Sequence, residues 1–145
     1  MNADRQSWVV SPSLPLLATM LAGTWLGWTW FAVNAIGLRG DGTRAQLRLL
    51  AIGLVVASAM AIGLYALLGI GVLSLRAFKY CAIALVAWKL WIGYRLSTAQ
   101  RVDHQLFEIY GGVTRNGSGV LIAGLMLRGY VLGALPDGWW ILVLA

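Results

Sequence analysis

Residues 49–75, LLAIGLVVASAMAIGLYALLGIGVLSL, decide the fold class, because they form a run of 27 residues without a charge. Arg48 and Arg76 bound this run on its two sides. At 1.5 Å per residue such a helix measures about 40 Å, whereas about 20 apolar residues suffice to cross a bilayer. The run therefore predicts a membrane-spanning helix that tilts or protrudes from the bilayer.

Three further stretches approach the same length. Residues 14–38 carry no charge, residues 78–96 contain Lys89, and residues 118–135 contain Arg128. Pro136, Asp137 and Gly138 then end the helical pattern, so the apolar tail 139–145 is expected to lie at the membrane interface. We predict an all-α, polytopic bundle of about four transmembrane helices, with residues 1–145 forming a single membrane domain.

Composition supports a membrane class and excludes a nucleic-acid partner. The chain is 60% hydrophobic and 11% charged, against about 25% charged residues in soluble domains. Its net charge of +6 comes from basic residues that flank the apolar runs, where they contact lipid headgroups. We expect lipid binding, with possible headgroup contacts at Arg95, Arg101 and Arg115, and no nucleic-acid binding.

The distribution of basic residues predicts the orientation. The two longer loops carry six arginines, whereas the opposite side carries three basic residues, Arg5, Arg76 and Lys79. Because short loops rich in Lys and Arg stay in the cytoplasm, both termini are predicted outside it. The short loops favour a bacterial inner membrane. The six loop arginines are Arg39, Arg44, Arg48, Arg95, Arg101 and Arg115.

The loop before the fourth stretch contains a further predicted helix. Ser97 and Gln100 have the spacing of a capping box, and Gly111 and Gly112 supply a stop, so a helix is expected over residues 98–110. Its apolar residues share one face, which is typical of a helix lying on the membrane surface. The alternative is that the third span continues into the cytoplasm as one long helix.

Arg128 is the most informative single residue. It lies eleven residues after Gly117 and nine before Asp137, which places it near the middle of its span. A guanidinium there costs about 2.5 to 3.5 kcal/mol even on the translocon-based scale. Asp137 points to the opposite helix face, and the first three spans contain no Asp or Glu. The expected partner is therefore a backbone carbonyl, water, a lipid phosphate, or a carboxylate of another subunit.

Lys89 lies only six residues before Arg95, so its long side chain is expected to reach the interface.

Small residues at four-residue spacing predict close helix packing, either within the chain or between chains. These candidate packing positions are Gly53, Ala57 and Ala61, Gly23 and Gly27, and Gly129 and Gly133.

The sequence offers no recognisable catalytic constellation. It has one histidine and one cysteine, which argues against a zinc site or an activated nucleophile. No enzymatic activity, cofactor or metal is therefore expected. Two functions remain: an accessory or scaffold subunit packed against other membrane proteins through Arg128, or a homo-oligomeric channel or transporter in which Arg128 lines the pathway.

Overall fold

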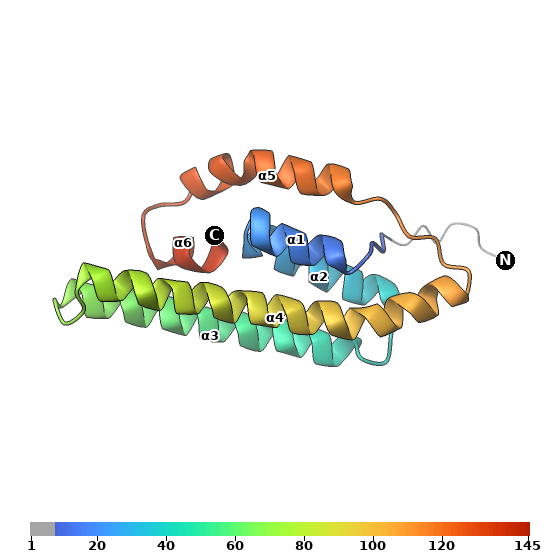
Figure 1. The fold of residues 1–145 in the computed structure, drawn as a ribbon, viewed down its shortest axis with the longest axis horizontal. Helices are drawn as coiled ribbons and strands as arrows, with labels where there is room; N and C mark the ends of the chain where they lie inside the picture. The colour runs from blue at the N-terminus through green and yellow to red at the C-terminus, as the bar shows by residue number, and fades with distance from the viewer. Residues whose placement is uncertain (1–7) are drawn as a thin grey trace.

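The computed structural model describes residues 8–145, and within them the fold is all-α, without a strand. Two long helices run antiparallel along one side of the molecule, two shorter helices pack on them as a hairpin, and another lies outermost (Figure 1). The sixth, very short helix is tucked between the outer helix and the long pair. The helices are α1 (Ser13–Leu21), α2 (Thr24–Leu38), α3 (Thr43–Gly69), α4 (Leu75–Ile109), α5 (Ser118–Gly133) and α6 (Trp139–Leu144).

The predicted span 14–38 is not one helix, which corrects the sequence analysis. Gly23 has φ +109°, a backbone conformation that residues with a side chain rarely adopt, and it separates α1 from α2. The two helices then run antiparallel, with Gly27 of α2 packed closely against Thr19 of α1. The chain therefore enters from one end of the molecule and returns to that end.

The predicted separate helix over residues 98–110 is also corrected, because α4 continues without a break to Ile109. The alternative of one long helix is the observed one. Ser97, Gln100 and His104 lie on its buried side, so the Ser97–Gln100 pair does not cap a helix. Apolar Val102 and Ile109 are exposed. The buried side of this part of α4 is thus polar, and its exposed side mixes apolar with charged residues.

Among residues 8–145, α3 is the one helix long and apolar enough to cross a membrane. The prediction of four spanning helices is therefore not supported. Most of the apolar surface of α3 faces outward, as at Ile52, Leu54 and Val55. The core helix of a soluble protein would instead bury such residues. The predicted span 118–135 corresponds to α5, which has 16 residues.

The main core joins α2, α3, α4 and α6 through Trp28, Phe31, Leu85, Ile92 and Val143. The predicted small-residue stripe of α3 lies in this core. At Gly53, a Cβ atom would come within 3.1 Å of Ile92 and 3.2 Å of Trp28. Ala57 and Ala61 are fully buried. The contact of this stripe is therefore within the chain.

Charged residues collect at one end of the long axis, which we call the arginine-rich end: the α2–α3 loop, the last turns of α4 and the segment before α5 (Figure 1). The N-terminal segment lies there too, because the backbone N–H of Arg115 donates to Val9 O over 2.9 Å. The position of residues 8–12 follows from the return of the α1–α2 hairpin. Arg5, which was predicted on the side opposite these loops, lies outside the described residues.

Candidate functional site

Three helix ends meet in the interior, halfway along the molecule. They are the C-terminal end of α1 at Leu21, the N-terminal end of α2 at Thr24, and the last turn of α6 around Val143 (Figure 1). The Thr24 hydroxyl donates a hydrogen bond to Val143 O. Backbone groups at helix ends lack partners within their own helix, so such a meeting point concentrates polar groups. We call it the helix-end junction.

Lys89 of α4 reaches this junction. Its side chain is 4% exposed, and Nζ donates to Leu142 O over 2.9 Å and to Val143 O over 3.5 Å. Ile92, one turn later on α4, packs on Gly53 near the midpoint of α3, so Lys89 lies at mid-height of the apolar helix pair. Lys89 was predicted to reach the membrane interface, and in the structure the carbonyls of α6, distant in sequence, bind its ammonium group instead.

Arg128 of α5 approaches the junction from the other side. Nη1 donates to Leu21 O over 3.0 Å, so its partner is a backbone carbonyl, one of the partners expected. The remaining N–H groups of the guanidinium have no hydrogen-bond partner among the described residues. Arg128 is partly exposed, whereas Lys89 is buried. Arg128 therefore retains unused donors.

The junction carries net positive charge. Neither cation has a carboxylate within 4.0 Å in the described chain, where the one ion pair is His104–Glu108 at 3.8 Å. The two like charges lie close enough to interact electrostatically. A cavity of about 120 Å³ adjoins Lys89. Thr19, Thr24 and Ala145 line it together with apolar side chains, and Arg128 is not among its lining residues. The arrangement thus combines two cations, spare donors and a small cavity.

A second buried polar group lies nearer the arginine-rich end and consists of Asn34, Gln46, Gln100 and Asp103, here called the amide cluster. Asn34 accepts from Val10 N and donates to Gln100 Oε1, both over 2.9 Å. Gln100 Nε2 donates to Phe31 O over 2.9 Å and to Gln46 Oε1 over 3.1 Å. Gln46 Nε2 completes the chain by donating to Asp103 Oδ2 over 2.9 Å.

Sequence reasoning missed both the helix break and the amide cluster. The signal for the break was the Gly23-Thr24 pair inside an uncharged run, since Gly-interrupted apolar segments are typical of discontinuous membrane helices. The signal for the cluster was the spacing of Ser97, Gln100 and His104, which puts three polar residues on one helix face.

The other predicted positions are distributed over the surface. A Cβ at Gly129 or Gly133 would meet no atom within 4 Å, so this pair mediates no packing in the described chain. Arg101 is exposed on α4. The guanidinium of Arg95 lies 5.8 Å from the ring centroid of Trp91, and that of Arg115 lies 5.1 Å from the ring centroid of Trp8.

Comparisons with known proteins add no relative. No protein-family model, curated protein or solved structure matches this chain.

Proposed function

We propose that this chain is an integral membrane protein that binds a small anion at the helix-end junction and conducts it across the membrane. The observation that carries the proposal is the position of Lys89 and Arg128. Both are bound by backbone carbonyls of interrupted helices, at mid-height of the apolar pair α3–α4. Interrupted helices meeting near the bilayer midplane are the usual construction of substrate sites in secondary transporters.

The distribution of apolar surface supports a membrane location. Large apolar side chains are exposed along α3, α4 and α5, including Val55, Tyr80, Ile83 and Met126. Soluble monomers seldom expose apolar patches beyond a few hundred Å². In the proposed topology α3 crosses the bilayer, and α4, which is less apolar, crosses beside it as the second half of a hairpin with Lys89 turned inward. The α1–α2 hairpin and α6 enter the bilayer partway from opposite ends.

The arginine-rich end faces the cytoplasm in this topology. It carries Arg39, Arg44, Arg48, Arg101 and Arg115, whereas the opposite end carries Arg76 and Lys79. Excess Lys and Arg on one side is the main determinant of orientation. In the proposed topology these loops and residues 8–12 therefore lie on the cytoplasmic side.

An anion is the ligand class that the junction fits. The C-terminal ends of α1 and α6 each offer about half a negative charge, which compensates Lys89 and Arg128 only in part. Spare N–H donors on both cations remain to bind an anion. The cavity of about 120 Å³ beside Lys89 has room for a small ion such as chloride.

The accessory-subunit hypothesis remains the second candidate, with less support than before the structure is considered. Two observations favoured this hypothesis: the small-residue stripe of α3 and the lack of a partner for Arg128. In the structure the stripe packs within the chain, and Arg128 donates to Leu21 O. What still favours it is α5, where Gly124 is the one residue buried and apolar side chains such as Ile122 and Met126 face outward. Lipid would cover this face equally well.

The proposal is tested by chloride flux in proteoliposomes that contain the purified full chain. We expect flux above that of empty vesicles in the wild type, and at least tenfold lower flux in Arg128→Gln and in Lys89→Met. Lys79→Met and Arg76→Gln are the matched controls, because both residues are exposed near the start of α4.

Folding of each variant is checked by circular dichroism and gel filtration before flux is measured. If Lys89→Met fails to fold, Lys89→Arg is used in its place, because arginine keeps the positive charge. Wild-type vesicles that conduct no more chloride than empty ones would contradict the proposal. So would a well-folded Arg128→Gln variant with unchanged flux. Loss of assembly with a second polypeptide, in place of lost flux, would favour the subunit hypothesis.

A further inference from the structure

A groove runs between the first turns of α3 and the middle of α4, at the border of the arginine-rich end. Its volume is about 530 Å³. Apolar walls come from Ala45, Leu49 and Ala99, and polar atoms come from Gln46, Tyr94, Arg95 and Thr98. The Gln46 amide already donates to Asp103. The groove is separate from the helix-end junction, since none of its lining residues contributes to that site.

Positive charge surrounds the groove. The guanidinium of Arg95 lies over the ring of Trp91, at 5.8 Å from the centroid, which restricts its position. Arg48 follows Ala45 by three residues and Arg101 follows Thr98 by three, so both lie one helical turn from lining residues. No Asp or Glu is among the lining residues of the groove. An anionic group is therefore the complementary ligand.

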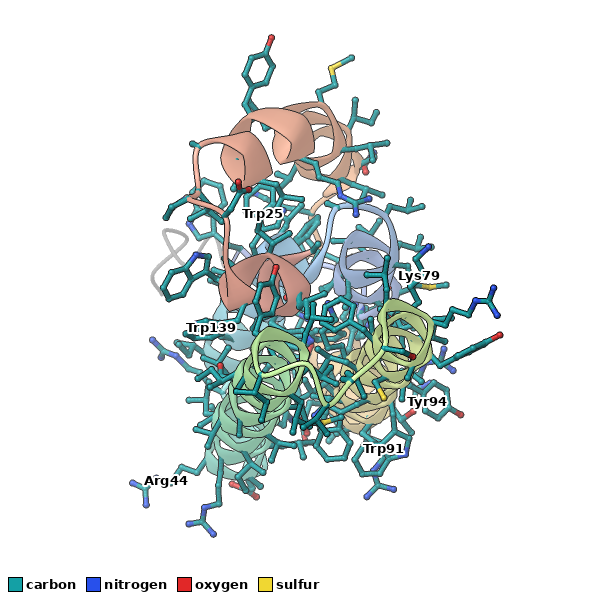
Figure 2. The ribbon with its side chains drawn as sticks, turned by 90° about the vertical axis from the view of Figure 1, so that its left-hand side faces the viewer. Trp25, Arg44, Lys79, Trp91, Tyr94 and Trp139 are labelled. Atoms are coloured by element: carbon teal, nitrogen blue, oxygen red, sulfur yellow. The ribbon has the colours of Figure 1, made fainter. Side chains whose placement is uncertain are left out.

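Apolar surface continues from the groove toward the middle of the molecule. Ile52 follows Leu49 by three residues and is 49% exposed, and Trp91, one turn before Arg95, is also 49% exposed. Figure 2 shows Arg44 projecting outward from α3, and Trp91 and Tyr94 projecting outward from α4. A ligand with a charged head and a long apolar tail would therefore match both parts of this surface.

We propose that the groove binds one anionic phospholipid, with its phosphate on Arg95 and an acyl chain along Ile52 and Trp91. Arginine binds phosphate oxygens in a bidentate manner, and the exposed Tyr94 offers a further hydroxyl donor. Arg48 and Arg101 attract the headgroup, as basic residues near a membrane surface do. This inference rests on the membrane location in the proposed function, but not on anion conduction.

The test is native mass spectrometry of the full chain in detergent, after incubation with phosphatidylglycerol or with phosphatidylcholine. We expect one phosphatidylglycerol to be retained at least tenfold more strongly than phosphatidylcholine. Arg95→Gln abolishes that preference, because a charged hydrogen-bond donor to the phosphate is lost. Arg76→Gln, an exposed arginine at the other end of α4, keeps it.

Two results would overturn the inference. One is equal retention of the two lipids by the wild type. The other is a preference in Arg95→Gln that matches that of Arg76→Gln, which would indicate attraction by overall charge. Failure of the membrane proposal is distinguishable, because the chain would then not insert into vesicles of either lipid. Selective lipid retention without chloride flux would leave this inference standing while the conduction proposal failed.

Discussion

The amide cluster and the helix-end junction both bury polar groups, but they differ in how completely those groups are paired. In the amide cluster each side-chain amide donates to a defined acceptor, and the links join the N-terminal segment, α2, α3 and α4. At the helix-end junction Lys89 and Arg128 meet only backbone carbonyls among the described residues, and donors remain unused.

The difference separates a structural role from a functional one. A paired network of neutral amides stabilises one arrangement of helices and has no capacity for a further ligand. A pair of cations without a carboxylate retains positive charge, and the surrounding apolar helices strengthen its field. Substitutions in the amide cluster should therefore change stability alone, whereas substitutions at the helix-end junction should change the response to anions.

The largest effect on stability is expected from Gln100→Leu. It removes the partner of Asn34, of Phe31 O and of Gln46, and an unpaired buried polar group costs about 1 to 3 kcal/mol. Unfolding in mixed detergent micelles should show a loss of about 3 to 5 kcal/mol. Gln105→Leu is the matched control, since Gln105 is exposed on the same helix. Equal stability of the two variants would refute the role of the cluster.

A somewhat smaller loss is expected from Gly23→Ala, which tests the helix break on which the junction depends. The new methyl group would collide with the carbonyl oxygen of Leu144, and φ +109° is strained for alanine. Strain of about 1 to 2 kcal/mol adds to overpacking of about 1 to 3 kcal/mol. The same unfolding assay measures the loss. An unchanged midpoint would mean that α1 and α2 can join without cost.

Lys89→Met sharpens the contrast between the two regions. Leu142 O and Val143 O lose a donor, but a costly buried charge is removed as well, so we expect a loss of only about 1 to 2 kcal/mol. The diagnostic result is that chloride no longer changes the unfolding midpoint, whereas Gln100→Leu keeps its chloride response. A normal chloride response in Lys89→Met would remove Lys89 from the proposed site.

The smallest effect is expected from Gly129→Ala, which serves as the counterpart of Gly23→Ala. A Cβ at Gly129 meets no atom within 4 Å, and alanine favours a helix by about 0.5 to 1 kcal/mol over glycine. The variant should be slightly more stable in the unfolding assay. A clear loss of stability would indicate that Gly129 contacts another chain, which would support the subunit hypothesis.

The sequence predicted the helical class and the long apolar helix α3, because an uncharged run of that length has few other stable forms. It could not place α6 beneath α5, since the contact of Lys89 with Leu142 spans 53 residues and follows from tertiary packing. It singled out Arg128 from the cost of a charge within an apolar stretch. The backbone partner of Arg128 arises from the break at Gly23, which hydrophobicity alone does not reveal.

Thermal unfolding of the purified chain in detergent, titrated with chloride and with the larger anion gluconate, tests anion binding at the helix-end junction most directly. The account predicts that chloride raises the midpoint of the wild type in a saturable manner and that gluconate does not. The shift should vanish in Arg128→Gln and Lys89→Met but persist in Lys79→Met. Equal effects of both anions, or an unchanged chloride shift in Arg128→Gln, would contradict it.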